Sequence, residues 1–384
     1  MKGIYAEMTS SDNIAKMDAQ TLEVVKMTND YGENSSTHKK VRIVMIKEVH
    51  KQLVQYLSER KVKHSNFKVG DIACADGRNS LDLYEMLQMD VNRGTNRLDS
   101  YQPLIRWIRE LAHNWNLCLS DLNDHSEAVQ RYFQGDPKVT FQKEANFYQQ
   151  IYSNESMDII VSSIAMHWLP KEMDWSGDMN AIHPGLTEKE IAERRQFAKE
   201  IFSDVITARA KELKPGGILI LANPCEHGTY SPLDLNPDGQ QKMLRLMRKL
   251  AVEEFGIDLQ VNCYFRTKDD YEEPFLENPQ TWSKVQSRNI EIGCAYYEKY
   301  LQDSETLERK EEASDKFSQA MVASIRAWSI SRLKRAFIDA GYTDEKLNRA
   351  LKEYYQKLEE AMRNNPDECH QDYNVNLLVA HRSK

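Results

Sequence analysis

The chain has 384 residues, of which 41% are hydrophobic and 29% charged, with a formal net charge of −8. This composition is typical of a soluble globular protein with a substantial core, and its acidity opposes a broad nucleic-acid surface. No apolar run approaches the ~20 residues needed to cross a bilayer, and the start MKGIYAEMTSSDN lacks a secretory apolar segment. Six scattered cysteines without a C-x-x-C pair argue against a zinc cluster or a disulfide framework and favour a reducing, cytoplasmic setting.

The first part of the chain alternates strand-like and helix-like segments. Helices are expected at about 40–60, 79–89, 101–114, 125–133 and 188–213, and strands at 67–73, 115–122, 139–141 and 157–163. The turn LKPGG then leads into a further buried strand that ends near residue 224. Strands that alternate with helices in this way favour an α/β fold with a mainly parallel, doubly wound sheet.

The pattern changes after residue 225. Helices are expected at 237–255, 306–339 and 344–363, whereas YNVNLLVAHR at 373–382 returns to a strand pattern. We therefore expect a ligand-binding α/β domain from residues 1–224 plus 365–384, and a mainly helical cap from residues 225–364. Met321, Ile325 and Trp328 share one helix face, which indicates core or lid packing, with a partner surface as the alternative.

The stretch DIACADGRN, residues 71–79, follows the first expected strand, where open α/β sheets bind ligands. Ala73 and Ala75 stand where a dinucleotide site needs glycines, and Asp76 would repel a phosphate. A cationic ligand without phosphate suits Asp71 better. S-adenosylmethionine is such a ligand, and Asp121, after the second strand, could bind its ribose diol. Either acid alone could equally be a helix cap or a turn residue.

Six stretches carry a further pattern in a fixed order. They are DYGENSSTH (30–38), DIACADGRN (71–79), LSDLNDHSEAVQRYF (119–133), ANFYQQIY (145–152), SSIAMHWLPK (162–171) and RQFAKEIFSDVITARAKELKPGGILIL (195–221). Together they resemble the SABATH family of S-adenosylmethionine-dependent carboxyl methyltransferases, with order and spacing kept over roughly residues 30–225. The resemblance implies a Rossmann-like class I methyltransferase fold with a helical cap, S-adenosyl-L-methionine as the cofactor, and a homodimer.

The resemblance also implies two groups of site residues. The cofactor-contacting positions are Tyr31, Ser35, Asp71, Asn79, Asp121, Leu122, Asn146, Phe147, Ser162 and Ser163. The acceptor site comprises His38, Ile164, Met166, His167 and Trp168, with His38 and Trp168 as the catalytic pair. Three positions depart from the family pattern: His38 replaces a Gln, Ile164 replaces a Tyr and Ala73 replaces a Gly.

Methylation of a carboxylate requires alignment rather than a general base or a metal. A carboxyl group with a pKa of about 4 is already ionised near neutral pH, and positioning can supply on the order of 7–11 kcal/mol. The indole N–H of Trp168 and the ring of His38 can each donate a hydrogen bond to the carboxylate, and a protonated His38 would add charge attraction. Ile164 makes the pocket more aliphatic, which favours a hydrocarbon-rich acid. Without the resemblance, core packing is the more usual interpretation of Trp168, and His167 could equally be a structural histidine.

The sequence therefore predicts an enzyme that converts a small-molecule carboxylic acid to its methyl ester, with neither a nucleic acid nor a membrane as partner. One alternative keeps the fold and the cofactor but methylates a ring nitrogen or a phenol, with His38 or His167 as the base. Another alternative is a non-catalytic S-adenosylmethionine-binding protein that acts through partners.

Overall fold

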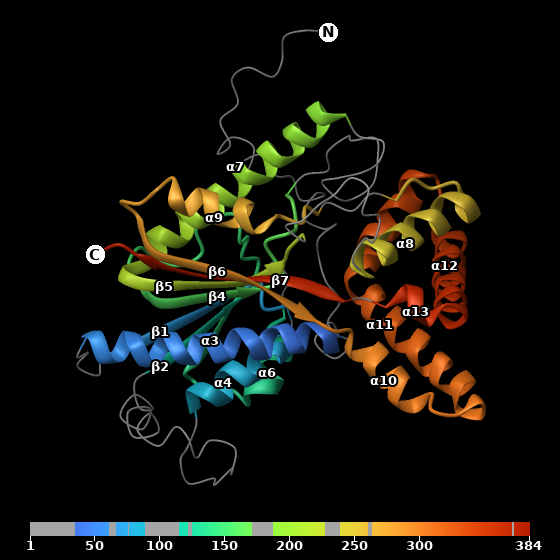
Figure 1. Ribbon diagram of the computed structural model, residues 1–384, viewed down its shortest axis with the longest axis horizontal. Helices are drawn as coiled ribbons and strands as arrows, with labels where there is room; N and C mark the ends of the chain where they lie inside the picture. The colour runs from blue at the N-terminus through green and yellow to red at the C-terminus, as the bar shows by residue number, and fades with distance from the viewer. Residues whose placement is uncertain are drawn as a thin grey trace.

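The computed structural model describes residues 35–60, 67–75, 77–88, 115–121, 125–170, 187–226, 239–259, 263–370 and 372–384. A sheet lies between two layers of helices, and a further group of helices lies to one side of it (Figure 1). The predicted site residues Tyr31 and Leu122 and the helix expected at 101–114 fall outside the described residues.

The described part of the sheet has seven strands. They are β1 (Phe67–Ile72), β2 (Trp115–Ser120), β3 (Val139–Gln142), β4 (Met157–Ser163), β5 (Leu213–Pro224), β6 (Trp282–Ile292) and β7 (Tyr373–Arg382). They follow the order β3-β2-β1-β4-β5-β7-β6; the first five pair in parallel, and β7 runs antiparallel to both β5 and β6. The mainly parallel, doubly wound sheet is confirmed. Its strand order reverses between β1 and β4, which places a ligand-binding switch point at their carboxyl ends.

Helices cover both faces of this sheet, so its central strands are apolar on both sides. One face carries α3 (Ser36–Arg60), α4 (Leu81–Gln88) and α6 (Ser126–Phe133), and the other carries α7 (Glu188–Glu212) and α9 (Lys268–Leu276) (Figure 1). A capping box at Thr187, whose hydroxyl accepts from the Glu190 backbone, begins the 25-residue α7. The helices predicted at 40–60, 125–133 and 188–213 are confirmed.

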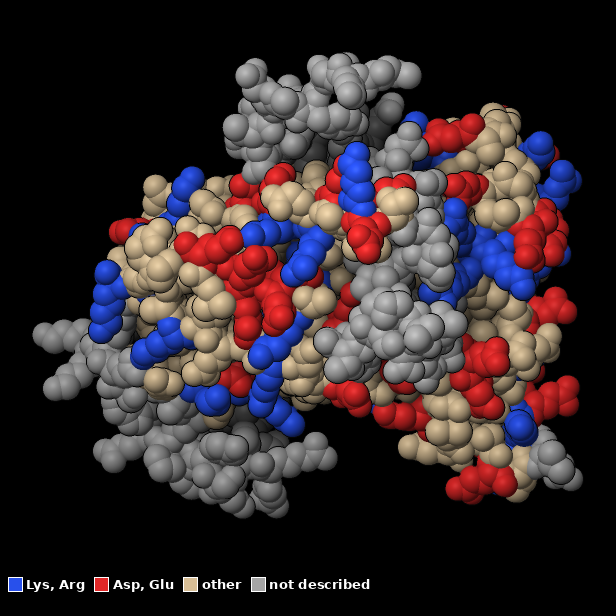
Figure 2. All heavy atoms as spheres, turned by 45° about the horizontal axis from the view of Figure 1, so that its top comes forward, with Lys and Arg blue, Asp and Glu red and all other residues tan. Residues whose placement is uncertain are grey.

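Ion pairs join the two helices on the second face. Arg195 of α7 lies 2.5 Å from Asp270 of α9, and Lys199 lies 3.2 Å from Glu273 and 2.8 Å from Glu277. Figure 2 shows lysine and arginine side chains interspersed with acidic ones on the side of the molecule where these helices lie. The Lys199 pairs are partly exposed, and pairs of this kind stabilise a fold by only about 0–1 kcal/mol each, whereas Asp270 is buried. Within the described residues, no helix combines the length and the apolarity that a membrane crossing requires.

The remaining helices pack around a core of their own. They are α8 (Gly239–Phe255), α10 (Ala295–Asp303), α11 (Leu307–Asp339), α12 (Asp344–Asn364) and α13 (Pro366–Cys369). We call this group the cap. Its core reaches Ala75 in the turn after β1, so the cap packs against the expected cofactor site.

The cap is less extensive than the sequence predicts. Residues 225–364 include α9, which packs on the sheet, and β6, which pairs with β7 inside it. The expected boundary is therefore wrong for these two elements; the division of the rest of the chain stays a prediction. The sequence WSKVQSRNIEI gave no strand signal because β6 is an edge strand with mostly polar, partly exposed side chains.

Candidate active site

The residues after β1 form a turn with an unusual backbone. Ala73, Ala75 and Gly77 have φ angles of 57°, 53° and 79°, in the left-handed region that favours glycine. A Cβ at Gly77 would meet the Val129 side chain at 3.1 Å. Both the positive φ angle and this close approach therefore favour glycine at position 77. For the two alanines this conformation costs about 1–3 kcal/mol each, and such strain clusters at ligand sites.

Asp121 ties this turn to the end of β2. Its carboxylate is 8% exposed and accepts a hydrogen bond of 2.9 Å from the Ala75 backbone N–H. The other carboxylate oxygen lies 3.6 Å from Nε2 of the buried His125. The structure thus places Asp121 beside the turn, at the carboxyl end of a strand next to the switch point, where the sequence predicts the ribose-binding acid.

Asp71 has different surroundings. It is fully buried at the end of β1 and forms an ion pair with Arg42 of α3, and the Ser80 hydroxyl donates a 2.6 Å hydrogen bond to it. A buried arginine therefore compensates its charge, and the pair fastens α3 to the sheet. This arrangement weakens the argument that Asp71 attracts a cationic ligand, and its contact with the cofactor stays a prediction.

The other predicted cofactor residues lie around the same ends of the strands. The Ala145 backbone N–H donates to the Asp121 carbonyl at 2.9 Å, which brings the half-buried Asn146 and Phe147 alongside Asp121. The Ser162 hydroxyl donates to the Ile72 carbonyl at 3.0 Å, so it links β4 to β1. The Ser163 hydroxyl accepts from Arg42 at 3.1 Å; Asn79 lies in the 3₁₀ turn Arg78–Ser80, and Ser35 is buried just before α3.

These residues fit S-adenosylmethionine. Asp121 offers a buried carboxylate to a ribose diol, and Phe147 offers an aromatic ring near it that could contact the adenine base. The turn has the small side chains of Ala73 and Ala75. It lacks the glycines that the binding of a pyrophosphate needs. When bound, S-adenosylmethionine would supply an electrophilic methyl group.

The segment after β4 carries the predicted acceptor residues. Ile164 has a φ of 54°, which is exceptional for a β-branched residue, and the Asn223 amide oxygen accepts from the Ala165 and Met166 backbones at 2.9 Å each. This sharp turn directs the chain toward the cap. The Trp168 ring packs on the cap core, with its centroid 6.0 Å from that of Trp328.

Ile164 and Met166 are both buried, at 8% and 2% exposure, and they belong to hydrophobic cores on opposite faces of the sheet. Ordinary packing accounts for both side chains. Their expected role as apolar walls of the acceptor pocket stays a prediction.

His167 and Trp168 lie together, with ring centroids 4.7 Å apart. His167 is 4% exposed, and this burial holds its pKa well below the ordinary value, so the ring is neutral at pH 7. Among the described residues, no hydrogen-bond partner is found for three buried polar atoms in this region: His167 Nδ1, Trp168 Nε1 and Tyr148 Oη. Buried polar atoms usually have partners, so this group marks a place suited to a polar ligand.

His38, at the start of α3, lies near this cluster. Its Nε2 is 2.7 Å from the Tyr373 hydroxyl, and burial lowers its pKa to about 4. The ring is therefore neutral at pH 7, and the charge attraction expected from a protonated His38 is not available. The charge of a protonated His38 would lower the pKa of His167 further. Hydrogen bonding from His38 to an acceptor stays a prediction.

Sequence reasoning missed Tyr148 and a buried arginine of the cap, Arg332. Tyr148 directly follows the predicted Phe147, but nothing in the local pattern indicates its burial. Arg332 had a weak signal, because it continues the spacing of Ile325 and Trp328 by four residues. Among the described residues, no group of three or more His, Cys, Asp or Glu side chains is arranged to hold a metal ion.

The strand order and the helices on both faces of the sheet define a class I methyltransferase fold. A solved structure of loganic acid methyltransferase with SAH aligns with a TM-score of 0.67 at 15% identity, over 94% of this chain and 99% of that chain. A family profile described as SAM dependent carboxyl methyltransferase matches residues 26–380. The chain belongs to this family, which confirms the resemblance to SABATH proteins.

Three curated plant proteins are similar to parts of the chain. Indole-3-acetate O-methyltransferase 1 of Oryza sativa subsp. japonica is 24% identical over 43% of this chain and 46% of its own length. The salicylate/benzoate carboxyl methyltransferase of Arabidopsis thaliana is 24% identical over 56% and 58%. The 3,7-dimethylxanthine N-methyltransferase 2 of Coffea arabica is 23% identical over 58% and 61%. The matched part of the chain thus spans about half the length of these relatives.

Proposed function

We propose that the protein uses S-adenosylmethionine to methylate the carboxylate of a small-molecule acid. The observation that carries this proposal is a set of buried polar atoms for which no hydrogen-bond partner is found among the described residues, on the adjacent His167 and Trp168 and on Tyr148. The Tyr148 ring lies 4.1 Å from that of Phe147, a predicted cofactor residue, in a chain of the carboxyl methyltransferase family. Trp168 Nε1 is a donor only, so it suits an anionic oxygen and cannot accept from a protonated nucleophile.

The proposed reaction balances without a general base. A carboxylate oxygen of the acceptor would form a bond to the methyl carbon that S-adenosylmethionine supplies, while the bond from that carbon to sulfur breaks and leaves its electron pair on sulfur. A methyl ester and S-adenosylhomocysteine result, and no proton is transferred. The residues of the chain would hold the acceptor in line and keep water away from it. The neutral His38 and His167 are consistent with donors that bind rather than titrate.

Methylation of a ring nitrogen is the second candidate. It is favoured by one observation, the similarity to the dimethylxanthine N-methyltransferase. A neutral His38 or His167 could accept a proton from such an acceptor. The other relatives are named for indole-3-acetate, salicylate or benzoate, and loganic acid, so the choice of acid stays open between aromatic and aliphatic classes.

A turnover screen tests the proposal. The protein and S-adenosylmethionine would be incubated with fatty, terpenoid, aromatic and indolic acids, and with matched amines, phenols and xanthines. We expect S-adenosylhomocysteine release and a methyl ester, identified by mass, for at least one acid. Turnover restricted to nitrogen or phenol acceptors would reject carboxyl methylation in favour of the second candidate. Cofactor binding without any turnover would support the non-catalytic alternative.

Two variants test the predicted acceptor side and the predicted cofactor side of the site separately. Trp168→Phe should lower kcat/KM about 10-fold or more while S-adenosylmethionine affinity is kept, because one hydrogen bond to a charged group is lost.

Asp121→Ala should weaken cofactor affinity in calorimetry by a similar factor, with Glu127→Ala of the exposed α6 surface as its matched control. Unchanged affinity in Asp121→Ala would remove the ribose role from this residue.

We also propose a homodimer that works in the cytoplasm. The dimer is supported by the family resemblance. The cytoplasm is supported by the six cysteines, none of which forms a disulfide within the described residues.

A further inference from the structure

The buried face of α11 is mainly apolar and carries one buried arginine. Phe317, Met321, Ile325 and Trp328 follow helical spacing and are each at most 9% exposed. Arg332 takes the next position on this face and is 4% exposed. Side chains three and four residues apart on a helix are neighbours, so the guanidinium belongs to the buried face of the cap.

Arg332 lies against the predicted acceptor site. Its guanidinium carbon is 5.1 Å from the centroid of the Trp168 ring, the geometry of a cation–π contact. Burial raises the pKa of Tyr148 and the charge of Arg332 opposes that rise, whereas burial lowers the pKa of His167 and the charge of Arg332 lowers it further. Both side chains are thus within the electrostatic reach of Arg332. The three residues that carry the buried donors are thus the ones near this arginine.

The chemistry of this group suits a carboxylate. A guanidinium stays charged at all physiological pH values and binds carboxylates through two parallel hydrogen bonds. The neutral donors of Trp168 and Tyr148 can bind an oxygen of any polar acceptor, whereas a cation distinguishes an anion from its neutral analogue. His38 cannot supply that cation at pH 7, because its pKa lies at about 4.

We propose that Arg332 binds the acceptor carboxylate beside Trp168, and that the cap thereby selects acids over neutral acceptors of the same shape. The inference rests on the proposed function, which supplies the acid. It assigns to α11 a specificity role that neither the sequence motifs nor the relatives indicate. A purely structural role, in which Arg332 only holds Trp168 against the cap, is the rival explanation.

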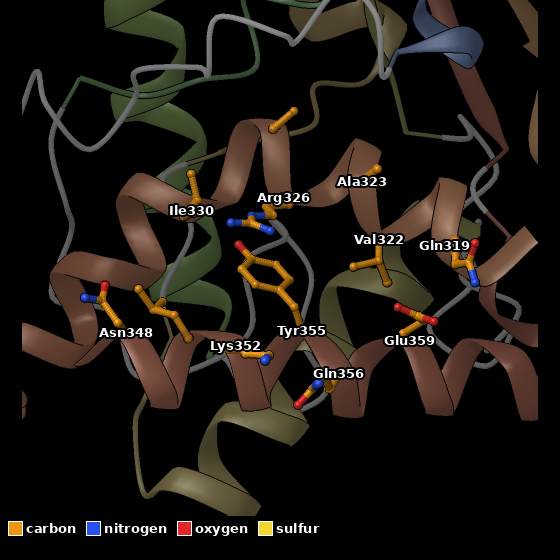
Figure 3. Close-up of a pocket in the computed structure, with 12 residues that line it drawn as sticks. Gln319, Val322, Ala323, Arg326, Ile330, Asn348, Lys352, Tyr355, Gln356 and Glu359 are labelled. Carbon is orange, nitrogen blue, oxygen red and sulfur yellow. The ribbon is translucent and has the colours of Figure 1, made fainter. Parts of the chain in front are cut away.

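The same helix offers a matched control on another face. Arg326 is exposed and lies over the Tyr355 ring at 5.6 Å, in a groove of about 900 Å³ between α11 and α12 (Figure 3). Like Arg332 it is an arginine stacked on an aromatic ring. Arg326→Met therefore removes an equivalent contact outside the acceptor site.

The test compares each acid with its primary amide. Indole-3-acetate and benzoate, and their amides, would be titrated by calorimetry onto wild type, Arg332→Met, Arg332→Lys and Arg326→Met, all saturated with S-adenosylhomocysteine. We expect Arg332→Met to weaken binding of the acid that wild type prefers by about 10- to 100-fold, with amide binding unchanged. Arg332→Lys should be intermediate, because it keeps the charge but not the two-pronged geometry. Thermal melts would verify folding.

Several outcomes would overturn the inference. Equal loss of acid and amide binding in Arg332→Met would assign a structural role, and a loss no greater than in Arg326→Met would remove any role in recognition. Wild type with no preference for the acid would also reject it. Failure of the proposed function looks different: acids would bind through Arg332, yet no methyl ester would form. If Arg332→Met does not fold, Arg332→Gln takes its place in the comparison with Arg332→Lys.

Discussion

Burial keeps the two histidines of the predicted acceptor site neutral at pH 7. His38 and His167 are the titratable rings of the site, and burial depresses the pKa of both below the ordinary range. Arg266, a second buried cation nearby, donates to the Met166 and Ala198 carbonyls at 2.5 and 2.6 Å and thus braces the backbone of the site. Positive charge near the acceptor therefore comes from arginine, whose ionisation does not change with pH in the working range.

The depressed pKa of His38 has a consequence for stability. Between about pH 6.5 and pH 4 the unfolded chain binds a proton at this residue and the folded chain does not, so acidification favours unfolding. We expect the denaturant midpoint of wild type to fall as the pH is lowered through this window. In His38→Gln the midpoint should fall less steeply. His167 contributes in the same direction.

His370 provides a control of opposite sign. The hydrogen bond to Asp372 raises its pKa, so its protonated form stabilises the fold at low pH, and this contribution is lost as the pH rises above its folded-state value. His370→Gln should therefore steepen the acid-side decline.

An unchanged pH profile in His38→Gln would show that His38 titrates normally.

Among the structural elements, α3 connects several parts of the predicted site. It contributes His38, and its Arg42 holds the buried Asp71 of β1 and reaches Ser163 of β4 at 3.1 Å. Replacement of both Arg42 and Asp71 by neutral residues of matching shape would change stability little. Removal of only one of them would leave a buried charge that water cannot solvate. The pair therefore fixes the position of α3 across the ends of two strands.

The removal of the Arg42 side chain should consequently destabilise the folded protein. Arg42→Met leaves the Asp71 carboxylate buried without its cation, and we expect the free energy of unfolding to fall by about 3–5 kcal/mol in denaturant titrations. Lys51→Met, an exposed lysine on the same helix, should change it by less than about 1 kcal/mol. A small effect of Arg42→Met, comparable to that control, would mean that the pair is solvated in solution.

The whole molecule brings the acceptor site together at a junction between the sheet and the cap. The Ala295 backbone of α10 donates to the Thr37 hydroxyl at 3.2 Å, and the Ser36 backbone donates to the Tyr296 hydroxyl at 3.0 Å. These bonds join the start of α3 to the cap, where Figure 1 shows the two in contact. The site thus depends on both parts of the fold.

The proposed homodimer is testable at this level of organisation. Sedimentation equilibrium of the purified protein should give twice the chain mass of 44.7 kDa over a range of protein concentrations. A mass equal to that of one chain throughout would reject the dimer and leave the proposed reaction unaffected.

Local patterns were enough to predict most of the strands and many of the helices, whereas the roles of the site residues stay predictions. The apolar run before Asp71, the acid after the second strand and the ordered motifs are features of neighbouring residues, and the sheet confirmed the fold that they indicate. The match to the family then followed from motif order, without knowledge of any contact.

Contacts between distant residues decided the rest. The sequence could not show that Asp71 pairs with Arg42, that His38 is neutral, that β6 completes the sheet or that Arg332 meets Trp168. Each of these depends on burial and on partners supplied by another element. The local residue pattern specifies which segments form helices and strands, but only tertiary packing determines the charge and the neighbours of each functional side chain.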